Sequence, residues 1–196
     1  FFNSKAIQGW GEIAINIGEF GELYLSQGRH RFVISKLLKI SEVKANIIVR
    51  HKNWINFRDN VLDFANCNGG KINLPLSHID LQYIPSHFSG NSLKLFEDIL
   101  KDKGKNILVL GSGWGFFCDK LEKLGHHCIA FEHSSEDLFF LEKLKVINKN
   151  KFKICNDFSN LSKLSNGKHF DLILSFFKHS DFNKLVTLDK IFSNLL

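Results

Sequence analysis

A short apolar segment followed by a glycine-rich turn and a helix-like segment is the feature that most constrains this fold. Ile107–Leu110 has the length of a buried strand, and the turn Gly111–Gly115 leads into a helix-like stretch over Phe116–Leu124. A second apolar segment, Cys128–Phe131, ends at the acidic residue Glu132. This order predicts a doubly wound α/β sheet, in which the turn approaches a nucleotide-type ligand and the acid accepts hydrogen bonds from ribose hydroxyls.

The spacing of the glycines separates this turn from the dinucleotide-binding fingerprint, which has glycine at its first, third and sixth positions. Here Gly111, Gly113 and Gly115 take the first, third and fifth positions, and Phe116 stands sixth. The pattern resembles the first motif of class I S-adenosylmethionine-dependent methyltransferases, and the resemblance covers roughly residues 91–196. It implies a Rossmann-like methyltransferase fold, incomplete at its C-terminal end. The alternative is a glycine-rich turn that merely joins a strand to a helix.

The resemblance assigns roles to the residues of the turn and to the acid that follows the second strand. It implies that the turn passes under the methionine part of the cofactor, S-adenosyl-L-methionine, and that Glu132 holds the ribose. The cofactor-binding residues expected in this part of the chain are therefore Gly111, Ser112, Gly113, Gly115 and Glu132.

Two further strands extend the resemblance. Phe152–Cys155 is predicted to be the third strand, and in the family an acid at the position of Asp157 commonly contacts the adenine amino group. The alternative for Asp157 is a loop aspartate that caps the next turn. Phe170–Phe177 is predicted to be the fourth strand, with Asp171 in a structural role. Because ligands bind beyond the carboxyl ends of parallel strands, the cofactor is expected to face Ser175, Phe176 and Phe177.

His179 follows the fourth strand and is the candidate catalytic residue. An imidazole titrates near neutral pH and could accept a proton from an oxygen or nitrogen of the methyl acceptor. The alternative is a solvated loop histidine. Methyl transfer from a sulfonium needs little acid–base chemistry and depends mainly on positioning, so the sequence does not identify the acceptor.

The N-terminal part of the chain has a different pattern. Residues 12–17 and 23–25 predict a β-hairpin around Gly18–Gly21, Phe32–Leu38 has apolar residues at helical spacing, and Ala45–Val49 is predicted to be a strand. This order predicts a small α+β domain ahead of the α/β sheet.

The segment Gly28-Arg-His-Arg31 resembles the GxHR signature of ParB-like and sulfiredoxin-like domains, over roughly residues 12–55. The resemblance implies that the glycine ends a strand and that a phosphate or nucleotide meets the start of the following helix. Helix N-termini favour anions, and arginines donate bidentate hydrogen bonds to phosphate. The expected anion-binding residues are Gly28, His30 and Arg31, with Arg29 at the rim. The alternative is a basic helix cap on a solvated surface.

A second basic group, Arg50-His-Lys52 with Trp54, would enlarge this pocket if it folded back beside Gly28–Arg31. Residues 66–90 are predicted to be an irregular linker. The linker contains His78, Asp80 and His87, but their spacing fits no regular ligand set, so no metal site is expected. An amphipathic helix is expected over Ser92–Lys103.

Composition fits an ordinary globular protein, with 44% hydrophobic and 23% charged residues among 196. No run of 18 apolar residues and no signal peptide is present, so a cytoplasmic protein without membrane association is expected. The four cysteines form no CxxC pair and are expected to be reduced. A net charge of +6 is compatible with a phosphate-bearing partner, yet it is too modest to establish nucleic-acid binding.

The domain organisation expected from these patterns is a ParB-like domain at 1–65, a linker at 66–90 and a methyltransferase domain at 91–196. The chain contains no methionine, begins at Phe1 and ends after a helix-like segment over Asn183–Leu196, without the remaining strands of a seven-stranded sheet. It is therefore interpreted as a fragment that is incomplete at both ends.

Three hypotheses for the function follow. The first is methyl transfer from S-adenosylmethionine to a small-molecule or polymer acceptor, with an N-terminal module that binds a phosphate-bearing ligand or nucleotide. The second is a ParB-like protein that binds nucleic acid or a nucleotide and carries a non-catalytic methyltransferase-like domain. The third is a nucleotide-dependent phosphotransferase.

Overall fold

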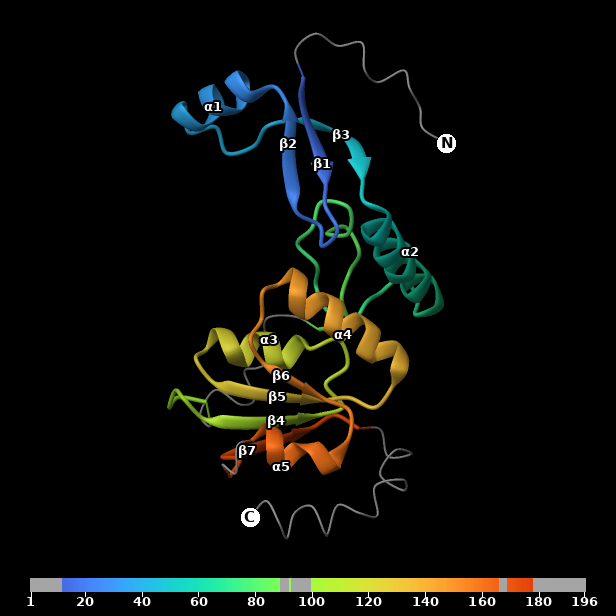
Figure 1. Cartoon of the computed structure of the whole chain (residues 1–196), viewed down its shortest axis with the longest axis vertical. Helices are drawn as coiled ribbons and strands as arrows, with labels where there is room; N and C mark the ends of the chain where they lie inside the picture. The colour runs from blue at the N-terminus through green and yellow to red at the C-terminus, as the bar shows by residue number, and fades with distance from the viewer. Residues whose placement is uncertain (1–11, 89–91, 93–99, 166–168, 178–196) are drawn as a thin grey trace. The chain divides into compact units, whose positions relative to one another are not determined.

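The computed structural model of the chain describes residues 12–88, 92, 100–165 and 169–177 (Figure 1). It divides into two compact units, residues 1–63 and residues 64–196. The division falls within helix α2 (Lys52–Cys67), and residues 64–88 group with the second unit.

The first unit contains a three-stranded mixed sheet in the order β2-β1-β3. Strand β1 (Ile13–Ile17) pairs antiparallel with β2 (Leu23–Gln27) and parallel with β3 (Ala45–Arg50), and helix α1 (Arg29–Leu37) connects β2 to β3. The predicted hairpin, helix and strand are therefore confirmed, with small shifts in their ends. The parallel β1–β3 pair requires a crossover connection, which α1 supplies.

The core of the first unit forms where α2 meets the hairpin. Trp54 is 1% exposed, and Phe57 and Val61 are also buried. These three residues recur at helical spacing, so they form the inward side of α2. A Cβ on Gly21, whose φ is +84°, would lie 2.6 Å from the Trp54 ring. Glycine therefore allows the hairpin turn to pack closely against the indole.

The sequence analysis placed Trp54 beside a basic surface group, and this placement is wrong, because the Trp54 side chain lies in the core. Its ring packs at 5.5 Å from that of Phe57. Residues 68–88 are irregular, as predicted, but they are not an exposed tether. Ile72, Leu74 and Leu81 are buried within the second unit, and Ile72 forms an isolated bridge with Ser86.

The second unit is built on a four-stranded, wholly parallel sheet in the order β6-β5-β4-β7. The strands are β4 (Asn106–Leu110), β5 (His127–Phe131), β6 (Lys153–Cys155) and β7 (Leu172–Ser175). The chain adds β5 and β6 on one side of β4 and then returns to place β7 on the other side. The predicted Rossmann-like, doubly wound α/β arrangement is confirmed for this unit.

Helices cover both faces of this sheet (Figure 1). The connecting helices α3 (Phe116–Lys123) and α4 (Ser135–Ile147) lie on one face, and α5 (Leu161–Leu164), which follows the short helix η3 (Phe158–Asn160), lies on the other. This arrangement explains the run of apolar residues in β4, since a strand covered on both faces is buried along its length.

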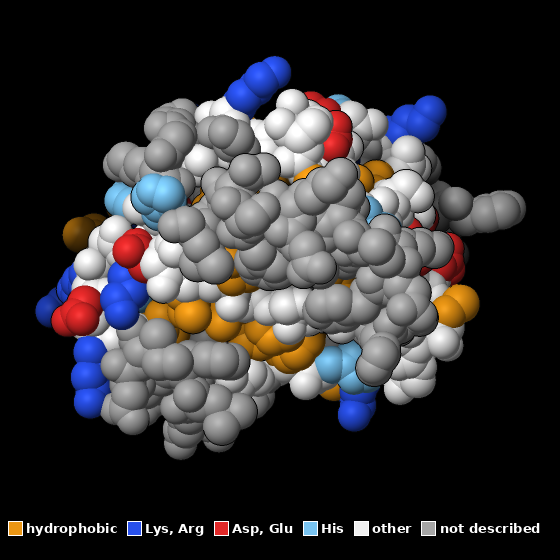
Figure 2. All heavy atoms as spheres, turned by 90° about the horizontal axis from the view of Figure 1, so that it is seen from below, with side chains coloured by type: hydrophobic (Ala, Val, Ile, Leu, Met, Phe, Trp, Pro, Cys, Tyr) orange, Lys and Arg blue, Asp and Glu red, His pale blue; other side chains and the backbone are white. Residues whose placement is uncertain are grey.

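The core on the α5 side centres on Leu108, Leu110, Ile129 and Phe131. Partly buried side chains, including Leu164 and Ile173, pack against this cluster, and hydrophobic side chains reach the surface on this side of the molecule (Figure 2). All four cysteines are free, as predicted. Burial raises the pKa of Cys128 to about 12, so this thiol stays protonated.

Two predicted helices, over residues 92–103 and 183–196, lie mostly or wholly outside the described residues. Within the described part of the chain, none of the helices combines the length and the apolar character that crossing a membrane requires. In the same part, no group of three or more His, Cys, Asp or Glu side chains is arranged to hold a metal ion.

Candidate functional site

The glycine-rich turn connects the carboxyl end of β4 to the start of α3, at the point where the chain order of the sheet reverses. Ligands of doubly wound sheets bind in the crevice at such a switch point, beyond the carboxyl ends of the strands. Gly111, Gly113 and Gly115 have φ values of +68°, +53° and +86°. These left-handed conformations disfavour residues with a side chain.

The three glycines differ in what surrounds them. A Cβ on Gly111 would lie 3.1 Å from the backbone nitrogen of Phe177, and a Cβ on Gly115 would lie 2.7 Å from Cδ1 of Leu141. These two glycines therefore allow close packing within the protein. A Cβ on Gly113 would meet none of the described atoms within 4 Å. Gly113 is thus the glycine of the turn whose open side faces away from the packed interior.

Glu132 lies directly after β5 and is 4% exposed. Its Oε2 accepts a hydrogen bond from the backbone N–H of Gly113 at 2.8 Å, which joins the ends of two neighbouring strands. Its Oε1 accepts hydrogen bonds from the N–H groups of His133 and Ser134 at 2.9 and 3.0 Å. The carboxylate is therefore held in one orientation at the carboxyl edge of the sheet.

This pattern limits how many further hydrogen bonds the Glu132 carboxylate can accept. An ionised carboxylate offers about four acceptor positions, and three backbone donors occupy three of them. About one position remains for a ligand hydroxyl without breaking a protein hydrogen bond. More than one ligand hydroxyl would have to replace a backbone donor.

The end of β7 forms the other wall of the site. The N–H of Phe176 donates to the carbonyl of Leu110 at 2.8 Å, so the backbone after β7 runs beside the turn. The Phe176 ring stacks on Phe117 with centroids 4.1 Å apart, and the Phe177 ring meets that of His133 edge-on at 5.5 Å. Ser175, the last residue of β7, is exposed and pairs with Leu110.

Asp157 follows β6 at the same edge of the sheet and is exposed. Its carboxylate caps helix η3, accepting hydrogen bonds from the N–H of Ser159 at 3.0 Å and from its Oγ at 2.6 Å. These bonds from Ser159 lower the pKa of Asp157 below its usual value. The capping alternative therefore describes its contacts within the protein, and the contact with adenine stays a prediction. His179 lies outside the described residues.

Sequence reasoning missed two neighbours of this site. Trp114, within the turn, is buried and stacks on Phe140 of α4 at 4.1 Å, with no hydrogen-bond partner for its Nε1 among the described residues. His133 lies half-exposed beside Glu132, with its Nδ1 3.6 Å from Oε1. Trp114 takes a variable position of the glycine motif and His133 follows the motif acid Glu132, so the motif predicts neither side chain, and the packing of α4 and β7 reveals both.

In the first unit, Gly28 occupies the predicted position between β2 and α1. Gly28 has a φ of +82°, and a Cβ at this position would lie 2.9 Å from Cα of Ile13. Both features require glycine. None of the described side chains caps the start of α1, and Arg29, His30 and Arg31 are exposed. The start of α1 is therefore uncapped among the described residues and flanked by exposed basic side chains, and its anion-binding role stays a prediction.

The second basic group does not join this segment. The pairing of Ala14 with Gln27 places Gly28 near the start of β1, whereas Ile17 pairs with Arg50 at its other end. Three residues of strand separate the two pairings, which is roughly 10 Å. The combined positive pocket that was considered from the sequence is therefore wrong, because the parallel β1–β3 pairing directs Arg50 away from Gly28.

No protein-family model and no curated protein matches the sequence. Among solved structures, a ribosomal protein L11 methylase from Lactobacillus delbrueckii subsp. bulgaricus is 19% identical, with 56% of this chain and 57% of that chain covered and a TM-score of 0.39. A putative RNA methyltransferase from Pyrococcus horikoshii is 24% identical over 50% and 52%, with a TM-score of 0.38.

A glycopeptide N-methyltransferase complexed with sinefungin is 17% identical, with 70% of this chain and 53% of that chain covered and a TM-score of 0.40. The chain thus spans about half the length of these three structures. At these values the comparisons assign no family, and the functional argument rests on the geometry of the site.

Proposed function

We propose that the second unit binds S-adenosylmethionine and transfers its methyl group to a small-molecule or polymer acceptor. The observation that carries this proposal is the hydrogen bond between the Gly113 N–H and Glu132 Oε2 at the switch point of a parallel sheet. It brings together an open glycine and a fixed carboxylate, which are the two groups that a ribose-bearing ligand needs at this edge.

The described residues fit the proposed cofactor. Gly113 leaves room for a ligand beside the backbone, Glu132 retains an acceptor position for a ribose hydroxyl, and Asp157 lies at the end of the next strand. The Oγ of Ser112, in the same turn, is buried and has no hydrogen-bond partner among the described residues.

S-adenosylmethionine, when bound, supplies a methyl group that its sulfonium already activates. The tasks left to this chain are to orient the ligand, exclude water and align the acceptor. Glu132 and the turn would provide the orientation. Near the turn, Trp114 stacks on Phe140 and Phe117 stacks on Phe176. His179 stays the proposed proton acceptor for substrates that must lose a proton.

Calorimetric titration of the full chain with S-adenosylmethionine and S-adenosylhomocysteine tests the proposal. Saturable binding of both compounds, with one site per chain, would support it. The absence of heat with either compound, for a chain shown to be folded by circular dichroism, would refute it. Nucleotide turnover in the same sample would favour the phosphotransferase hypothesis, and binding of DNA that weakens with salt would favour the nucleic-acid hypothesis.

For the first unit, we infer that the start of α1 binds a phosphate-bearing ligand through Gly28, His30 and Arg31. The support is a nine-residue helix whose N-terminus has no side-chain cap among the described residues and has exposed cationic residues beside it. Titration of the full chain with inorganic phosphate, followed by amide chemical shifts, tests this inference. Shifts confined to other segments would refute it.

A further inference from the structure

Helix α1 of the first unit exposes its apolar residues and buries a polar one. Ser35 is the buried residue of this helix, and its Oγ donates to the carbonyl of Phe32 at 2.8 Å. The exposed apolar residues of α1 are Val33, Ile34, Leu37 and Leu38. Leu37 is 77% exposed. A surface helix usually directs its apolar side toward the core, so the orientation of α1 is the reverse of the usual one.

The four exposed apolar residues form one continuous arc on the helix. At about 100° per residue, the positions from Val33 to Leu38 that are apolar span roughly 140°. Phe32, which is half-buried, and Ser35 lie on the opposite side. The apolar arc therefore faces away from the rest of the first unit, from which α1 projects at one end of the sheet (Figure 1).

The loop after α1 extends this apolar surface. The helix ends at Lys39, which has a φ of +53°, and the N–H of Ile40 donates to the carbonyl of Ser35 at 2.9 Å. Ile40 and Val43 are both exposed. Six large hydrophobic residues are thus exposed within residues 33–43. Apolar surface that is concentrated in this way indicates an interaction site.

Cationic residues surround the apolar surface. Arg31 lies at one border of the arc, and Arg29 and Lys36 lie beyond the other border. None of the ion pairs within the described residues uses these side chains. Residues 29–44 contain five exposed Lys or Arg residues and one acidic residue, Glu42. A partner that fits this surface must therefore offer negative charge on both sides of an apolar contact.

A lipid bilayer fits these requirements better than a protein does. A second copy of this chain would bring five cationic residues against five others, and this repulsion opposes association. An acidic protein would need an apolar groove that matches the shape of a projecting helix and loop. A bilayer needs no matching shape, and its anionic headgroups lie directly above an apolar layer.

We propose that α1 and the loop after it dock on the surface of an anionic lipid bilayer. The apolar arc would enter the boundary between headgroups and acyl chains, and the flanking cationic side chains would reach the lipid phosphates. Docking on a surface requires no spanning helix. The proposal therefore departs from the sequence-based expectation of no membrane association, which depended on the absence of a long apolar run.

The proposal goes beyond the functions proposed above. It does not depend on methyl transfer, because α1 belongs to the first unit and the proposed cofactor site to the second. It also differs from the binding of phosphate at the start of α1, because phosphate needs none of the apolar residues. The two inferences about α1 can therefore fail separately.

Cosedimentation of the full chain with lipid vesicles tests the proposal. One preparation contains phosphatidylcholine and phosphatidylserine in equal amounts, and the other contains phosphatidylcholine alone. We expect binding to the anionic vesicles that weakens as salt is added. Binding to the neutral vesicles should be at least tenfold weaker, since each cationic residue near an anionic surface contributes roughly fivefold.

Three outcomes of this experiment would overturn the proposal. They are equal binding to both preparations, no binding to the anionic vesicles, and binding to soluble polyglutamate without binding to vesicles. The last outcome would favour an acidic protein as the partner of α1.

Leu37→Gln tests the apolar contact. It removes an apolar side chain from the arc and should weaken binding to the anionic vesicles at least fivefold. Leu124→Gln, at an exposed leucine of the second unit, is the matched control and should bind like the parent chain. Parent-like vesicle binding of Leu37→Gln would overturn the proposal. If circular dichroism shows that Leu37→Gln is unfolded, Val33→Thr takes its place, because it changes polarity with little change in volume.

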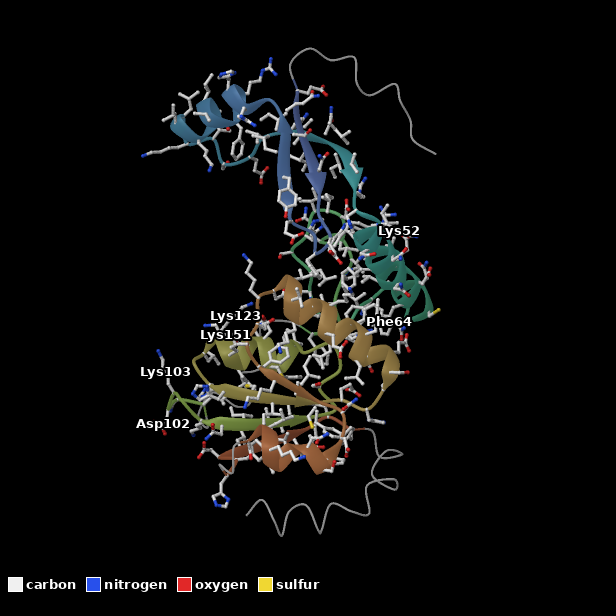
Figure 3. The ribbon with its side chains drawn as sticks, in the orientation of Figure 1. Lys52, Phe64, Asp102, Lys103, Lys123 and Lys151 are labelled. Atoms are coloured by element: carbon white, nitrogen blue, oxygen red, sulfur yellow. The ribbon has the colours of Figure 1, made fainter. Side chains whose placement is uncertain are left out.

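Lys36→Gln tests the ionic contact. It should weaken binding to the anionic vesicles about fivefold and leave phosphate binding intact, because Lys36 lies in the last turn of α1. Lys103→Gln, at an exposed lysine of the second unit that Figure 3 labels, is the control and should change the affinity by less than about twofold. Parent-like vesicle binding of Lys36→Gln would contradict the proposed contact with the lipid phosphates.

Discussion

At the scale of single residues, the three glycines of the glycine-rich turn differ in what surrounds them. Gly111 and Gly115 are required because the ends of β7 and helix α4 approach them closely, whereas Gly113 has open space beside it. The spacing of the three glycines predicts the turn, but it does not distinguish these roles. The positions of Phe177 and Leu141, which are distant in sequence, distinguish the two glycines that allow close packing from Gly113, which has open space beside it.

Glu132→Ala is expected to weaken S-adenosylmethionine binding by about 1.5–3 kcal/mol, roughly ten- to a hundredfold, because it removes a charged hydrogen-bond acceptor. Glu136→Ala, on the exposed first turn of α4, is the matched control and should bind normally. Calorimetry measures both affinities. Because Glu132 also holds three backbone N–H groups, a thermal melt of each variant must accompany the titration. Parent-like affinity in Glu132→Ala would contradict the ribose-binding role.

Gly113→Ala and Gly115→Ala are expected to fail in different ways. Alanine at Gly115 would meet Leu141 at 2.7 Å and adopt a left-handed φ, so we expect the free energy of unfolding to fall by about 2–4 kcal/mol. A Cβ at Gly113 meets no described atom. The left-handed φ alone should lower the free energy of unfolding of Gly113→Ala by only about 1–2 kcal/mol. The main effect of Gly113→Ala should be lost cofactor affinity. Urea unfolding and calorimetry separate the two effects, and a folded Gly113→Ala chain with normal binding would remove the main support for the site.

At the scale of elements, the sequence predicts strands better than helices. The apolar runs of β4 and β5 are short, continuous and bounded by turn residues, so their burial on both faces is evident from the sequence. Helix α4 was not predicted because four apolar residues stand together at 138–141, a pattern that does not repeat at helical spacing. Its Ser134 cap, which accepts a hydrogen bond from the Asp137 N–H at 3.3 Å, was the available signal.

Helix α2 was missed for a different reason. Its first residues continue the basic segment Arg50–Lys52, and the helical spacing of Trp54, Phe57 and Val61 begins only after that segment. Truncation of Trp54 to alanine is expected to lower the free energy of unfolding of the first unit by about 3–5 kcal/mol, because the cavity would lie in its core. Arg58→Ala, on the same helix, should cost about 0.5 kcal/mol or less. Chemical denaturation checks both values. A loss below 1 kcal/mol for Trp54→Ala would contradict this account of the core.

The start of α1 carries a prediction about a helix terminus. Arg31→Ala should abolish phosphate binding and leave the thermal midpoint nearly unchanged, because Arg31 is exposed and none of the ion pairs within the described residues uses its guanidinium. Lys36→Ala, in the last turn of the same helix, is the control and should retain binding. Phosphate titration and a thermal melt test both variants. A large loss of stability in Arg31→Ala without any detectable phosphate site would show that Arg31 has a structural role, and the ParB-like functional interpretation would fail.

At the scale of the whole molecule, the sequence predicts two parts of different architecture, and the structure contains two compact units. What the sequence could not predict is the order of the strands. The position of β7 beside β4 depends on a connection that crosses to the other face of the sheet, and no local signal records that crossing. A cavity at the edge of the parallel sheet where the strands begin could not be predicted either, since its lining comes from segments that are separate in sequence.

The division into two units makes the cofactor proposal testable by differential stability. A ligand that binds one unit only in its folded state stabilises that unit by RT ln(1 + [L]/Kd), about 2.7 kcal/mol when its concentration is a hundred times Kd. S-adenosylhomocysteine should therefore raise the midpoint of the unfolding transition that exposes Trp114, which lies within the glycine-rich turn. The transition that exposes Trp54, in the core of the first unit, should not move. Hydrogen exchange with mass spectrometry assigns each transition by its peptides. Equal protection of both units, or protection of the first unit alone, would contradict the placement of the cofactor at the carboxyl edge of the parallel sheet.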